Sequence, residues 1–181
     1  MNKWLRTTGL FVSFGLVTAV AAAKISAATG NSVVFKATGP AGLNIEGKTS
    51  TLEVKDDGTE ATFSVPLSSV KTGIALRDTH MCEKYLECGK HPKAELKIKR
   101  SDVKLEDGKE SSGEAPGKLT LHGQTKDVKV KYKAKKAGGD VTVDANTTFK
   151  YTDFGVTKAE YLGAEVKPDI NLHVTTTLKD G

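Results

Sequence analysis

The chain has 181 residues and a formal net charge of +5, from 27 lysines and arginines against 22 aspartates and glutamates. This length accommodates one domain with a substantial hydrophobic core. The sequence contains no G-x-S-x-G, no H-E-x-x-H and no glycine-rich phosphate loop, so we do not expect an enzyme.

Residues 1–23 have the pattern of an export signal that is removed from the mature protein. Two basic residues precede an apolar run over residues 10–20, and three alanines follow that run. A membrane-spanning anchor would need about 20 apolar residues, and this run is shorter. We expect cleavage after Ala23, with Ala28 as an alternative, and a mature periplasmic protein of residues 24–181 that forms one domain.

From residue 32 onward, short segments alternate apolar and polar residues, which is typical of strands with one buried and one solvated face. Turn sequences such as Asp56-Asp57-Gly58 separate these segments. The predicted strands cover residues 32–38, 43–54, 60–67, 94–103, 118–122, 127–135, 141–151 and 167–178. Their spacing favours antiparallel hairpins over parallel crossovers, so we expect an all-β fold, either an up-and-down barrel or a sandwich.

Six lysines lie between residues 126 and 136, and four of them alternate with Val128, Val130, Tyr132 and Ala134. This alternation indicates a strand with a solvated face. No aromatic residue shares the lysine face to stack on bases, so we do not expect a nucleic acid as partner. A weak contact with an anionic membrane surface is compatible with these charges.

The segment around residues 77–87 carries the one helical signal in this strand-rich sequence. Met81 and Tyr85 are four residues apart and would share a face of a helix. Cys82 and Leu86 have the same spacing. A short amphipathic helix must bury its apolar side, so we expect it to cover the sheet or the open end of a barrel.

The two cysteines, Cys82 and Cys88, are six residues apart. In an exported protein such a pair is usually a disulfide. Six residues of continuous helix rise about 9 Å, whereas bridged Cα atoms are rarely more than about 7 Å apart, so a disulfide requires the helix to end before Cys88. Alternatively, the two cysteines with His80 and His91 suit a metal or redox site, because sulfur and imidazole bind zinc or copper.

Several short pieces of the sequence, taken in order, resemble YceI-like proteins. They are VPL at 65–67, TG at 72–73, LRDTHM at 76–81, HP at 91–92, LTLHGQTK at 119–126 and DFGV at 153–156. YceI-like proteins are bacterial, lipocalin-like barrels that bind polyisoprenoids and are mostly exported to the periplasm. The resemblance extends from about residue 32 to 178. This chain departs from the family pattern at His91, where an aromatic residue is common, and at both cysteines.

The resemblance implies an eight-stranded antiparallel lipocalin-like barrel with a short helix, about residues 77–87, at one opening. It also implies a non-catalytic function: binding the tail of a polyisoprenoid or quinone-like lipid inside the barrel, for carriage, storage or protection, without another cofactor. The protein would be a monomer or a homodimer. By analogy, the ligand-binding residues would be Phe35, Phe63, Val65, Leu76, Met81, Tyr85, Leu86, Leu121, Phe149, Phe154 and Leu172.

Two alternatives to a lipid-binding barrel remain open at this point. One is a periplasmic protein that handles a metal or redox equivalents through His80, Cys82, Cys88 and His91. The other is a barrel filled by its own side chains, which would act only through its surface, since a barrel of about eight strands can be solid or can hold a small ligand.

Overall fold

The structure is a computed structural model that describes residues 24–27, 30–161 and 163–180. The expected export signal, residues 1–23, lies outside the described residues. The strands are β1 (Ile25–Ala27), β2 (Ser32–Thr38), β3 (Asn44–Thr49), β4 (Glu53–Asp56), β5 (Glu60–Pro66), β6 (Lys93–Lys99), β7 (Glu110–Leu121), β8 (Gln124–Ala137), β9 (Asp140–Lys150), β10 (Glu160–Tyr161), β11 (Ala164–Glu165) and β12 (Asp169–Asp180).

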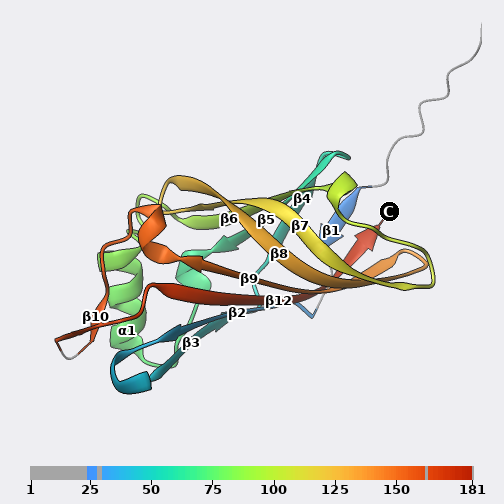
Figure 1. The fold of residues 1–181 in the computed structure, drawn as a ribbon. Coiled ribbons are helices and arrows are strands. Elements are labelled where there is room, and N and C mark those ends of the chain that lie inside the picture. The colour runs from blue at the N-terminus through green and yellow to red at the C-terminus, as the bar shows by residue number, and fades with distance from the viewer. Residues whose placement is uncertain (1–23, 28–29, 162, 181) are drawn as a thin grey trace, which may run out of the picture.

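One antiparallel sheet curls round the molecule in the order β3-β2-β12-β9-β8-β7-β6-β5-β4, and β1 also pairs with β12 (Figure 1). The expected all-β, lipocalin-like barrel is therefore confirmed. The described sheet has nine strands along this path instead of eight, because one predicted strand is interrupted; β1 lies off the path. β1 and β2 both lie along β12, and residues 50–52 break the predicted strand 43–54 into β3 and β4.

Residues 50–52, between β3 and β4, carry the chain from one end of the sheet order to the other. The Thr51 amide donates to the Thr49 hydroxyl at 3.0 Å, a local turn that bends the chain away from the β3 ladder. β4 then pairs with β5 at the other end of the order. Lys48 and Lys71 also exchange two backbone hydrogen bonds of 2.9 Å, which tie β3 to the segment that follows β5.

β7 is longer than the predicted strand 118–122. The part of β7 before residue 118 contains Gly113, Pro116 and Gly117, which read as loop residues in the sequence. A side chain at Gly117 would lie 2.9 Å from a methyl of Leu96 on β6, so this glycine leaves room for its neighbour. These glycines lower the strand propensity of the sequence, but they leave room for side chains of the neighbouring strands.

The helical segment consists of α1 (Ala75–Thr79) followed by a π-helical turn, His80–Tyr85, and so begins two residues before the predicted position. In the wider turn the Leu86 amide donates to the Met81 carbonyl at 2.9 Å. The Asp78 carboxylate accepts from the Thr72 amide at 2.8 Å, and Arg77 donates to the Thr72 carbonyl at 2.7 Å. These bonds hold α1 against the chain that leaves β5. No helix in the described part of the chain is long and apolar enough to cross a membrane.

Buried residues form two main clusters along the length of the curled sheet. The first lies beneath the helix and consists of Leu67, Leu119, Leu121, Val128, Val130, Tyr151, Phe154 and Val156. We call it the helix-end cluster. The second, the β1-end cluster, consists of Ile25, Ala115, Tyr132, Ala134, Val141 and Leu178. α1 and β1 lie at opposite ends of the molecule (Figure 1).

Candidate ligand cavity

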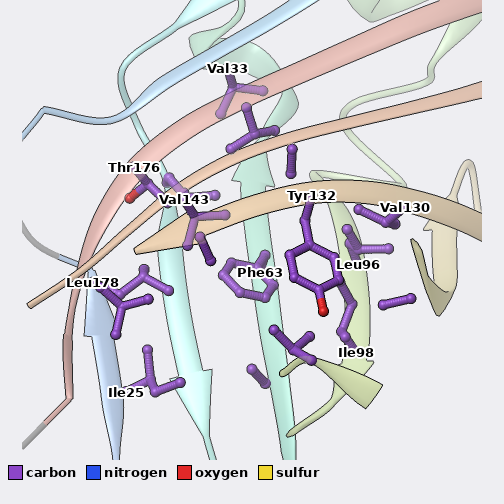
Figure 2. A pocket seen from close by; sticks show the side chains of 18 of the residues that line it. Ile25, Val33, Phe63, Leu96, Ile98, Val130, Tyr132, Val143, Thr176 and Leu178 are labelled. Carbon is purple, nitrogen blue, oxygen red and sulfur yellow. The ribbon is translucent and has the colours of Figure 1, made fainter. Parts of the chain in front are cut away.

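An apolar cavity of about 150 Å³ lies inside the curled sheet (Figure 2). All six residues of the β1-end cluster line it, whereas only Leu119 and Val130 of the helix-end cluster do so. The cavity therefore occupies the half of the sheet that is farther from α1. The helix-end half is packed with side chains.

The walls of the cavity follow from strand periodicity, because every second residue of a strand points to the same face. β8 contributes Val130, Tyr132 and Ala134, and the lysines between them are exposed. β5, β6, β9 and β12 contribute Ala61, Phe63, Val65, Ala94, Leu96, Ile98, Val141, Val143, Ala145, Leu172, Val174, Thr176 and Leu178. β1, β2, β7 and the chain before β4 complete the lining with Ile25, Val33, Ala115, Leu119 and Leu52.

The few polar groups of the wall are satisfied by neighbours. The Tyr132 hydroxyl accepts a 3.0 Å hydrogen bond from the Lys104 amide. The Thr176 hydroxyl donates to the side-chain oxygen of Asn31. Because buried polar groups without partners would favour water over an apolar ligand, this pairing leaves an effectively apolar interior.

The segment of residues 100–105 covers one end of the cavity. Arg100, Val103 and Leu105 line the cavity, and the Arg100 amide donates to the Thr59 carbonyl at 2.9 Å. The Arg100 guanidinium lies 3.3 Å from the carboxylate of Asp56, whose side chain has no exposed surface. That carboxylate also accepts from the Ile25 amide at 2.7 Å, so one buried acid links β1, β4 and this segment.

Three of the predicted ligand-binding residues line the cavity: Phe63, Val65 and Leu172. Leu121 and Phe154 lie in the helix-end cluster instead, and Tyr85, Leu86 and Phe149 pack against it. Leu76 is 65% exposed, and Met81 is half-buried on the π-helical turn. The helix residues predicted to border the pocket thus lie at the packed end.

Phe35 lies on the same face of the sheet as its cavity-lining partner Leu172, but it does not line the cavity and instead contacts Gly47 on the neighbouring strand. A side chain at Gly47 would lie 2.2 Å from the ring of Phe35, so the ring covers the bare backbone of the glycine. Phe35 also packs against a small third cluster of Ala37, Ile45 and Val166. Its apolar character therefore serves packing between β2, β3 and the chain before β12.

Sequence reasoning missed the contribution of residues 99–105 to the cavity. Lys99, Arg100, Val103 and Leu105 all line it. The sequence analysis continued a regular strand to residue 103, whereas β6 ends at Lys99 and a 3₁₀ turn, Arg100–Asp102, follows. Tyr132 could have been predicted as a cavity residue, because it alternates with exposed lysines and therefore lies on the buried face of its strand.

The predicted disulfide between Cys82 and Cys88 is confirmed, with Cα atoms 5.1 Å apart. The helical turn ends at Tyr85, as the bridge requires. Because both sulfur atoms are bonded to each other, they are not thiolate ligands, and His80 is exposed. The four residues of the alternative metal or redox site are therefore not assembled as one ligand set.

An antiparallel sheet curled round an apolar cavity, with a short helix over its packed end, defines a lipocalin-like binding barrel. The model of the YceI-like domain matches residues 17–178, so this chain belongs to the YceI-like family, as its sequence pieces predicted. A comparison with curated protein sequences found no significant match.

Several solved structures share this fold. A polyisoprenoid binding domain from Saccharophagus degradans, implicated in plant cell wall breakdown, aligns with a TM-score of 0.75 at 15% identity, over 88% of this chain and 99% of that domain. BcnA of Burkholderia cenocepacia aligns with a TM-score of 0.64 at 18% identity, over 81% of this chain and 95% of BcnA. The YCEI protein of Campylobacter jejuni gives 0.52 at 17% identity, over 100% of this chain and 99% of that protein.

Proposed function

We propose that this protein binds the apolar tail of a polyisoprenoid or quinone-like lipid in the cavity, without catalysis. The observation that carries the proposal is the apolar cavity itself, since almost every lining side chain is aliphatic or aromatic. Membership of the YceI-like family and the fold shared with a polyisoprenoid binding domain support it.

Apolar burial would supply the binding free energy. Removing apolar surface from water contributes about 25 cal/mol per Å², so a few hundred Å² of buried tail outweighs part of the ordering cost of binding. The wall offers few polar groups to a tail, so chain length and shape would decide which tails fit.

The charged lining residues indicate where the head group would lie. Among the described residues that line the cavity, Lys99 and Arg100 alone carry a charge, and they are adjacent at the end of β6. A tail that entered here would leave its polar head beside them, at the end covered by residues 100–105. Carriage, storage or protection of such a lipid in the periplasm completes the proposal, on the strength of the export pattern of residues 1–23.

Native mass spectrometry of protein purified from its native host tests this function. We expect an excess mass that solvent extraction removes and that fragments as an isoprenoid. An unchanged mass after extraction, in several preparations, would contradict the proposal.

A pair of variants on β9 makes the test specific to the cavity. Ala145 lines the cavity, whereas its neighbour Asn146 is exposed on the outer face. Ala145→Phe should fill the cavity and abolish the excess mass, while Asn146→Phe should retain it. If Ala145→Phe does not fold, Leu96→Phe, on another cavity-lining strand, β6, provides a second obstruction. Equal retention by the inward and outward variants would place the lipid elsewhere.

A further inference from the structure

A cluster of potential metal ligands lies at the helix end, apart from the cavity. One ligand atom from each of Glu87, His91 and His122 can be chosen so that all three lie within 4.8 Å of one another. Nε2 of His122 is 3.0 Å from a carboxylate oxygen of Glu87, and the two imidazole rings are 4.8 Å apart between centroids. All three residues are half-buried.

The backbone is bent into uncommon conformations to assemble this cluster. Among the described residues, three other than glycine have a positive φ, and two of them are Glu87 (46°) and His122 (50°). Such left-handed conformations are disfavoured for side chains with a Cβ and persist where surrounding structure enforces them. Here the disulfide at Cys88 and the tight turn between β7 and β8 provide that enforcement.

Local hydrogen bonds place His91 beside Glu87. The Glu87 carbonyl accepts from the Lys90 amide at 2.7 Å and from the His91 amide at 2.9 Å, which closes a turn between the two ligands. On the other side, a Cβ at Gly123 would lie 2.8 Å from the His91 ring. The β7–β8 turn is thus shaped to admit this imidazole.

One tautomer of His122 directs a lone pair into the cluster. Nδ1 of His122 lies 3.3 Å from the backbone carbonyl oxygen of Phe154, which can only accept a hydrogen bond. With the proton on Nδ1, Nε2 is an acceptor, and it faces a carboxylate oxygen, also an acceptor. In this tautomer the two acceptors can share a metal ion, whereas a proton on Nε2 would be donated to the Glu87 carboxylate.

We propose that Glu87, His91 and His122 bind a divalent transition metal ion such as Zn²⁺. Two imidazoles and one carboxylate are a suitable donor set for zinc, with a fourth position open to solvent or another ligand. The carbonyl behind His122 supplies the outer hydrogen bond that metal-bound imidazoles usually make. Lys90 binds the other carboxylate oxygen of Glu87 at 2.6 Å, which leaves the first oxygen directed at the histidines.

The geometry needs only a small adjustment to close around an ion. Zinc bonds of about 2.0–2.2 Å place neighbouring ligand atoms of a tetrahedral site about 3.3 Å apart. The Glu87–His122 separation of 3.0 Å is already close to that value, so the adjustment falls on the His91 ring. This site shares only His91 with the set predicted from the sequence.

Zinc binding to the tag-free, disulfide-intact mature protein, measured by isothermal titration calorimetry after chelator treatment, tests the proposal. We expect one ion per chain, with at least tenfold weaker binding in Glu87→Gln, His91→Gln and His122→Gln. His173→Gln is the matched control, because His173 also pairs with a carboxylate, Asp144, at 3.1 Å on the outer surface. His80→Gln controls for an exposed histidine.

Imidazole NMR signals of the unaltered protein provide a measurement that does not depend on variant folding. Added Zn²⁺ should shift the signals of His91 and His122 and leave those of His80 and His173 in place. The proposal is overturned if zinc shifts all four histidines alike, if it shifts none, or if His173→Gln weakens binding as much as His122→Gln.

Discussion

Single residues adjust the packing between strands, and Gly47 shows this most directly. The Phe35 ring occupies the space where any side chain at position 47 would lie. Such a glycine lowers the intrinsic strand propensity but gains contact between its backbone and an aromatic ring. Strand propensity alone predicts that Gly47 weakens the strand, whereas in the structure its backbone packs against the Phe35 ring.

Gly47→Ala should therefore destabilise the protein by about 1–3 kcal/mol, since the new methyl group forces the Phe35 ring out of its position. Urea unfolding measures this change. Gly89→Ala is the matched control, because a Cβ at Gly89 meets no atom within 4 Å and its φ is not positive. Equal unfolding midpoints for the two variants would refute the packing role of Gly47.

Asp57 makes the stability depend on pH through the turn between β4 and β5. A hydrogen bond from the Thr59 hydroxyl, with others from the Glu60 and Thr59 amides, lowers the pKa of Asp57 from 3.8 to about 2. A carboxyl with a lowered pKa stabilises the folded state above its ordinary pKa, and this contribution is lost as pH falls towards the folded value.

We expect the stability difference between the unaltered protein and Asp57→Asn to shrink as pH falls from about 4 to about 2. Chemical unfolding at a series of pH values measures it. A difference that stays constant across this window would show that the turn does not depend on the charge of Asp57.

Among the elements, the helical segment was predicted best and its role least well. Its apolar face followed from the spacing of Met81 and Tyr85, and the disulfide was predicted from the expected export of the chain. Its place over a packed end was not predicted, because a helix covers a cavity and a filled core with the same apolar face. The predicted strand 118–122 is shorter than β7, because the glycines before residue 118 resemble loop residues.

Replacing both cysteines by serine should lower the free energy of unfolding by about 2 kcal/mol, as expected for a bridge that closes a short loop. Urea unfolding of the two forms measures the loss. Lipid retention should be unchanged, because neither cysteine lines the cavity, which lies towards the opposite end of the barrel. Zinc affinity should fall, because Glu87 adjoins Cys88. Lost lipid with intact zinc binding would contradict the positions assigned to the two sites.

For the whole molecule, alternation in the sequence predicts which face of a strand is buried but not how far along the barrel a residue lies. Phe63, Val65 and Leu172 line the cavity, whereas Leu121 and Phe149, apolar strand residues as well, lie in or against the packed helix-end cluster. The period of two is the same in both halves. Only the pairing register between strands distant in sequence separates a cavity wall from a filled core.

The account depends on the cavity being an occupied binding site. A crystal structure of protein purified from its native host, without added lipid, tests this most directly. We predict elongated density between β5, β6, β8, β9 and β12, with its polar end beside Lys99 and Arg100. A cavity that holds only water, or one closed by its own side chains, would contradict the account.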